Sequence, residues 1–241
     1  MSAIAQNGSL AKFYPNTGTT IENCLLASKT TNDRYGVSTI LSANTVARLN
    51  AIEPLFRQAR ANVFKLKAQL FELNAQKDKA RTETAMHTSH FLQVFNMGVA
   101  RGKYSFAERA LFQLPVEKPE VPKMHSDGKI WWAAEWVVKG EAKRIADGKE
   151  PMVNPSGAEV EAKYNQFVQL TGLVAKADSI LCDEQIALRK LQKEARAIIK
   201  RVWNEVETYY CEGTRERMRK HARDWGVHYA HKGGEKKLHG T

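Results

Sequence analysis

Apolar and small residues recur at alternating steps of three and four along two stretches of the chain, at about 44–101 and 157–211. In the first stretch these positions are Leu49, Ile52, Phe56, Ala59, Val63, Leu66, Leu70, Leu73, Ala80, Phe91 and Val94. In the second they are Phe167, Leu170, Val174, Ala177, Leu181, Leu188, Leu191, Ala195, Ile198, Val202 and Tyr209. Such a stripe needs a partner helix along its length. The pattern therefore predicts the all-α fold class, with an extended antiparallel, coiled-coil-like helical hairpin.

Turn and capping signals divide the chain into five predicted segments. These are an irregular N-terminal arm (1–41) with a short helix near 20–28 and an extended piece near 35–41, a first long helix (42–102), a small Pro- and Trp-rich helical head (103–155), a second long helix (156–212), and a short basic helix with a tail (213–241). The sequences Ser105-Phe-Ala-Glu108 and Ser156-Gly-Ala-Glu159 have the spacing of a capping box, so we expect a helix to begin after each serine.

The antiparallel arrangement also predicts which residues of the long helices face each other. Partners should have residue numbers that sum to roughly 256 to 260, so that Leu66–Leu73 face about Leu188–Leu191. In this register Lys77 and Glu184 fall within about one turn of each other, which suggests an ionic layer that sets the alignment. Solvated side chains along a thin seam are the alternative.

The middle of both helices, at residues 74–88 and 175–187, carries little apolar surface beyond the seam. Because two helices alone bury little surface, we expect self-association or a protein partner to support this part.

The chain has 37 Lys and Arg against 26 Asp and Glu, a net charge of +11. This excess favours an acidic partner such as nucleic acid, an anionic membrane or an acidic protein surface. Positive residues gather near the C-terminus, at Arg215, Arg217, Arg219, Lys220 and Arg223, where phosphate contacts are a reasonable hypothesis. A solvated basic surface is the simpler interpretation, because no recognition-helix, zinc-finger or RNA-recognition signature occurs.

The head contains three tryptophans, Trp131, Trp132 and Trp136. Large aromatic residues on one helix are typical of anchors that fill a small core. The alternative is an exposed patch for a partner protein or a membrane interface.

No catalytic constellation stands out. The sequence lacks a Gly-x-Gly-x-x-Gly loop, a P-loop, a Gly-x-Ser-x-Gly elbow and a His-Glu-x-x-His motif. Glu83, His87 and His90 have metal-ligand spacing on a helix, but the facing stretch of the return helix offers no further carboxylate or histidine. Cys24, Cys182 and Cys211 are odd in number and far apart, which argues against a disulfide framework. We therefore expect no enzyme activity, cofactor or metal.

The N-terminal residues show no secretory signal, and the densest apolar stretch, 130–138, is too short to cross a membrane. These features lead us to expect an intracellular, cytoplasmic protein without a transmembrane segment.

The leading functional hypothesis is a non-enzymatic structural or adaptor subunit of a larger assembly, which uses its helical hairpin to space and bind protein partners or further copies of itself. A basic nucleic-acid-binding protein that uses its C-terminal basic region is one alternative. A membrane-active helical protein that inserts the Trp-rich head is another.

Overall fold

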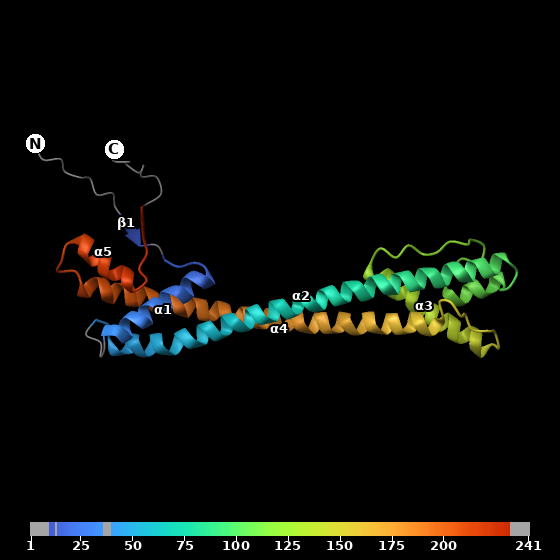
Figure 1. Cartoon of the computed structure of the whole chain (residues 1–241), viewed down its shortest axis with the longest axis horizontal. Coiled ribbons are helices and arrows are strands. Elements are labelled where there is room, and N and C mark those ends of the chain that lie inside the picture. The colour runs from blue at the N-terminus through green and yellow to red at the C-terminus, as the bar shows by residue number, and fades with distance from the viewer. Residues whose placement is uncertain (1–9, 13, 36–39, 232–241) are drawn as a thin grey trace, which may run out of the picture. The chain divides into compact units, whose positions relative to one another are not determined.

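The computed structural model describes residues 10–12, 14–35 and 40–231 (Figure 1). Its elements are β1 (Leu10–Lys12), α1 (Gly18–Tyr35), α2 (Ala43–Ala100), the 3-10 helix η1 (Phe106–Phe112), α3 (Asp127–Ala146), α4 (Gly157–Tyr209), α5 (Arg215–Asp224) and β2 (Tyr229–His231). The predicted all-α class is confirmed. In the described part of the chain, strands are limited to β1 and β2, which pair antiparallel with Leu10 opposite His231.

The chain divides into two compact units, and both long helices contribute to each. Unit 1 comprises Met1–Lys65 and Cys182–Thr241, and unit 2 comprises Leu66–Leu181.

In unit 1, buried side chains come from α1, the first part of α2, the last part of α4 and the segment around α5. They include Ile21, Cys24, Leu25, Leu49, Ile52, Phe56, Ile198, Val202, Trp203, Ala222 and Trp225. The beginning of α2 is tied to α4 because the Glu205 carboxylate accepts hydrogen bonds from Thr45 Oγ1 at 2.7 Å and from the Ser42 amide at 2.8 Å.

The N-terminal arm is more ordered than we predicted. The helix predicted near 20–28 is present but longer than expected, because α1 covers 18 residues. Its buried positions return at helical spacing, but half of them are polar: Ser28, Thr31 and Asn32. The hydroxyls of Ser28 and Thr31 donate to the carbonyl oxygens of Trp225 and Asp224, at 3.0 and 2.6 Å. Because these carbonyl oxygens satisfy the hydroxyl groups, the polar face of α1 can be buried without leaving its hydrogen-bond donors unpaired. Of the predicted extended piece at 35–41, residues 36–39 lie outside the described residues.

In unit 2, the core gathers around Phe91 and Phe95 of α2 and Phe112 of η1, whose rings meet edge to face at centroid distances of 5.6 and 4.8 Å. Val137 of α3 and Val160 of α4 complete this cluster.

The contact between α3 and η1 requires a glycine. A Cβ atom on Gly140 would lie 2.5 Å from the Phe112 ring and 2.7 Å from the backbone oxygen of Leu111. Without a side chain here, the two elements can pack closely enough to close the core.

Arg109 holds the proline-rich connector, residues 115–122, which lies between η1 and α3. Arg109 is 1% exposed, and its guanidinium donates to the carbonyl oxygen of Pro115 at 2.8 Å and of Glu120 at 3.3 Å. It also donates to the side chain of Asn96 and the carbonyl oxygen of Lys118. Burial lowers the pKa of Arg109 from its ordinary value. The extended connector is thus fixed to η1 and α2.

The predicted register of the two long helices is wrong in both units. Thr84 Oγ1 of α2 donates to the carbonyl oxygen of Lys163 of α4 at 2.9 Å, whereas the prediction placed roughly residues 172–176 opposite Thr84. In unit 1, Thr45 meets Glu205 instead of roughly 211–215. The reason is that α2 continues past the beginning of α4, and its last turns pack on η1 and α3 through Phe95 and Val99.

The three cysteines are expected to differ in reactivity. Cys24 is buried, and burial raises the pKa of its thiol to about 11, whereas Cys182 and Cys211 are exposed. Because the thiolate is the reactive form, a thiol reagent near pH 8 should modify Cys182 and Cys211 rapidly and Cys24 only after unfolding. Mass spectrometry of the labelled protein checks this expectation. Equal labelling rates at all three positions would contradict the burial of Cys24.

Candidate interaction sites

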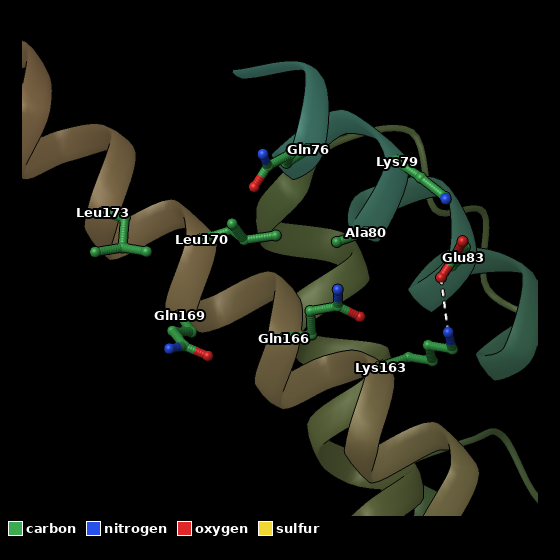
Figure 2. Close-up of a pocket in the computed structure, with 9 residues that line it drawn as sticks. All are labelled: Gln76, Lys79, Ala80, Glu83, Lys163, Gln166, Gln169, Leu170 and Leu173. Carbon is green, nitrogen blue, oxygen red and sulfur yellow. Dashed lines mark hydrogen bonds and ion pairs between the residues drawn. The ribbon is translucent and has the colours of Figure 1, made fainter. Parts of the chain in front are cut away.

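Unit 2 contains a groove of about 480 Å³ between α2 and α4. We call it the glutamine groove. Its lining comprises Gln76, Lys79, Ala80, Glu83, Lys163, Gln166, Gln169, Leu170 and Leu173. Figure 2 shows Leu170 pointing from α4 toward Ala80 of α2, with the amides of Gln76 and Gln166 beside them. Ala80 is buried and Leu170 is half-buried against it, so the groove has an apolar floor and polar edges.

An ion pair closes one end of the glutamine groove. The ammonium group of Lys163 lies 2.7 Å from the Glu83 carboxylate (Figure 2). The hydrogen bond from Lys163, together with the positive charges of Lys163 and Lys79, holds the pKa of Glu83 below its ordinary value. Both ion-pair side chains are partly exposed, so this pair contributes little to stability.

The groove offers hydrogen-bonding groups suited to recognition. Glutamine amides both donate and accept hydrogen bonds, and the lining contains no Ser, Cys or His. Of the three residues with metal-ligand spacing, Glu83 pairs with Lys163, and the His87 ring nitrogen Nδ1 lies 2.9 Å from the Glu83 carbonyl oxygen. No group of three potential metal-binding side chains gathers among the residues that the structure describes.

Next to the groove, the two helices leave their seam partly uncovered. At 66–79 of α2 and 170–180 of α4, where the structure describes every residue, no side chain is fully buried. The seam positions Leu66, Leu70 and Leu73 are only half-buried. Beside them, Phe71 is 77% exposed, and Leu173 and Ile180 are each 43% exposed. Leu173 and Ile180 stand seven residues apart and therefore share one face of α4. We call these two stretches the uncovered seam.

The three tryptophans of α3 have different environments. Trp131 is half-buried and packs on Phe167 with ring centroids 6.0 Å apart. Trp136 is also half-buried, with the Lys139 ammonium 5.3 Å from its ring centroid. Trp132 is 42% exposed. Trp131 thus fills the core of unit 2, while a partner-binding role for Trp132 and Trp136 stays a prediction.

The ionic layer of Lys77 and Glu184 stays a prediction, because the two residues belong to different units. The Lys77 ammonium lies 3.6 Å from the Asp127 carboxylate of α3, which also binds Arg81 at 2.7 Å. Glu184 belongs to unit 1. Within unit 2, Lys77 therefore helps to attach the beginning of α3 to α2.

The basic residues of α5 differ in their exposure to solvent. The Arg219 guanidinium lies over the Tyr229 ring, 5.6 Å from its centroid, and is half-buried. Arg215, Arg217, Lys220 and Arg223 are exposed.

Unit 1 contains a hollow of about 420 Å³ beside the first turn of α5, which we call the tyrosine pocket. Its lining comprises Tyr35, Tyr209, Tyr210, Glu212, Gly213, Arg217, Met218 and His221. Sequence reasoning identified the basic residues of this region and placed Tyr209 in the stripe of the second long helix, but it did not predict that the aromatic rings line a pocket with Arg217.

Comparison with protein-family models, with curated proteins and with solved structures finds no significant match. Within the described residues, no helix combines the length and the apolar character needed to span a membrane.

Proposed function

We propose that the protein is a non-enzymatic structural subunit of a larger assembly, and that copies of the chain associate through the uncovered seam and the glutamine groove of unit 2. The observation that carries the proposal is the exposure of Phe71, Leu173 and Ile180 beside a seam in which no residue of 66–79 or 170–180 is fully buried. Helical pairs gain most of their stability from packing, so a surface of this kind favours a further helix.

The composition of this surface favours a second copy as the occupant. Unit 2 contains 16 Lys and Arg against 14 Asp and Glu, so two copies can approach with little net repulsion. The amides of Gln76, Gln166 and Gln169 are both donors and acceptors, so the same groove on a second copy offers them matching partners. Such self-complementarity is what a two-fold symmetric interface requires.

Replacing both Leu173 and Ile180 by Glu should abolish the association. Two carboxylates would have to be buried in an apolar interface, which should weaken self-association by at least about a hundredfold. Light scattering on the full chain should give about twice 27.2 kDa for the wild type and 27.2 kDa for the double variant.

Val153→Glu is the matched control, because Val153 is 83% exposed in unit 2 and is absent from both the groove and the seam. It should leave the mass unchanged. A wild-type mass of 27.2 kDa at all concentrations would refute the proposal. A double variant that still associates would show that copies meet through another surface.

A further inference from the structure

The net positive charge of the chain is concentrated in unit 1. This unit has 21 Lys and Arg against 12 Asp and Glu, so it carries nine of the eleven net positive charges. An excess of this size attracts polyanions and releases their counterions on binding. Unit 1 is therefore the part of the chain where an anionic ligand is expected.

Within unit 1, the lining of the tyrosine pocket contains both aromatic rings and a positively charged side chain, Arg217. Tyr210 stacks on His221, with ring centroids 4.7 Å apart and planes at 11°, and Tyr209 meets Tyr210 edge to face at 5.0 Å. Tyr209 is 50% exposed and Tyr35 is 51% exposed. Burial, together with the neighbouring Tyr35, raises the pKa of Tyr210 to about 12, so its hydroxyl group stays protonated. One face of the Tyr35 ring already stacks on Trp225, with centroids 6.1 Å apart. The half-exposed Tyr209 ring at the edge of the hollow is therefore the one positioned to stack on a planar ligand.

The charged groups of the pocket suit different parts of a nucleotide. The exposed Arg217 belongs to the lining, and Arg215 and Lys220 are exposed on the same short helix. Guanidinium groups bind phosphate oxygens in pairs of hydrogen bonds. Glu212 would repel a phosphate, but its carboxylate can accept a hydrogen bond from the amino group of a base. The pocket volume lies within the range of about 300–1,000 Å³ that is common for small-ligand sites.

We propose that the tyrosine pocket binds an unpaired nucleotide of a single-stranded nucleic acid, with the base stacked on Tyr209 and the adjoining phosphate on Arg217. A base within a duplex is already stacked, so only a single strand can present its face to these rings. The carboxylates of an acidic peptide could pair with the arginines, but they offer no planar group to stack on the aromatic rings. This inference does not depend on the self-association of unit 2.

Fluorescence anisotropy with the full chain and labelled oligouridine, oligodeoxythymidine and duplex DNA tests the proposal. Both single strands should bind more tightly than the duplex, with an affinity that falls as salt rises. Tyr209→Ala should weaken single-strand binding by about tenfold, since it removes one base-stacking contact. Arg217→Gln should weaken binding and lower the slope of log affinity against log salt by about 0.7.

Two control variants separate the pocket from the basic surface in general. Phe64→Ala removes another exposed aromatic ring of unit 1, and Arg48→Gln removes another exposed charge. Phe64→Ala should leave the affinity unchanged, and Arg48→Gln should change it less than Arg217→Gln.

Three results would overturn the proposal. They are the absence of oligonucleotide binding at low salt, equal effects of the pocket and control variants, and Tyr209-dependent binding of polyglutamate that displaces the oligonucleotide. The last result would assign the pocket to an acidic protein partner.

Discussion

Replacing Arg144 by Met is expected to lower the free energy of unfolding of unit 2 by about 3 to 5 kcal/mol. The Arg144 side chain is 1% exposed and binds the carboxylates of Glu141 at 2.7 Å and Glu108 at 2.9 Å. Glu141 is itself 3% exposed and also accepts a hydrogen bond from the Met152 amide at 2.6 Å. Methionine fills much of the volume of the arginine side chain, but it leaves the buried Glu141 carboxylate without its positively charged partner. Urea unfolding followed by hydrogen exchange of unit 2 measures the loss.

Lys143→Met is the matched control for this variant. Its side chain is 61% exposed and forms an ion pair with Asp147 on the surface of α3. The control should change stability by less than about 0.5 kcal/mol. Equal effects of the two variants would show that the buried network does not stabilise unit 2.

Acid should reduce the difference between the wild type and Arg144→Met. Burial by itself would raise the pKa of Glu108, but the hydrogen bonds from Arg144 and the Ser105 amide outweigh it and hold the pKa below its ordinary value of 4.5. A carboxyl group of this kind stabilises the folded state above its ordinary pKa, and the contribution is lost as the pH falls through the lowered value. The stability difference should therefore shrink below pH 4.5.

Trp203→Ala is expected to lower the stability of unit 1 by about 3 to 5 kcal/mol. Trp203 is fully buried, and the Tyr14 ring stacks on it with centroids 5.2 Å apart. Truncation to alanine would leave a cavity between α4 and the N-terminal segment that backbone movement cannot fully close. Thermal unfolding followed by circular dichroism measures the effect.

Tyr209→Ala serves as the control for Trp203→Ala, because it removes a half-exposed ring from the same helix. It should cost no more than about 1 kcal/mol. If Trp203→Ala were as stable as Tyr209→Ala, the core of unit 1 would not depend on the indole ring.

The sequence predicted the two long helices because their seams are strongly apolar. It did not predict α1 in full, because Ser28, Thr31 and Asn32 are polar at buried positions. Their burial depends on carbonyl groups near α5, which local patterning cannot show. The register failed for a related reason. The seam alone does not show how far the last turns of α2, around Phe95, extend past the beginning of α4 to pack on η1 and α3.

The candidate sites were only partly predictable. Clustered charge identified α5, but the tyrosine pocket also needs Tyr35, which the fold of unit 1 brings to Tyr209 and Tyr210. The glutamine groove could not be predicted from the sequence, because glutamines that line a groove are spaced like glutamines on a solvent-exposed helix surface. In both cases the missing information is the tertiary arrangement of polar residues.

Hydrogen exchange measured over a range of protein concentrations tests the central claim most directly. The amides of residues 66–79 and 170–180 should become more protected as concentration rises, because a second copy covers the uncovered seam. The amides around Phe91 and Phe95 should not change, since their cluster is buried within one copy of unit 2. Protection of the uncovered seam that is the same at every concentration would contradict self-association through unit 2.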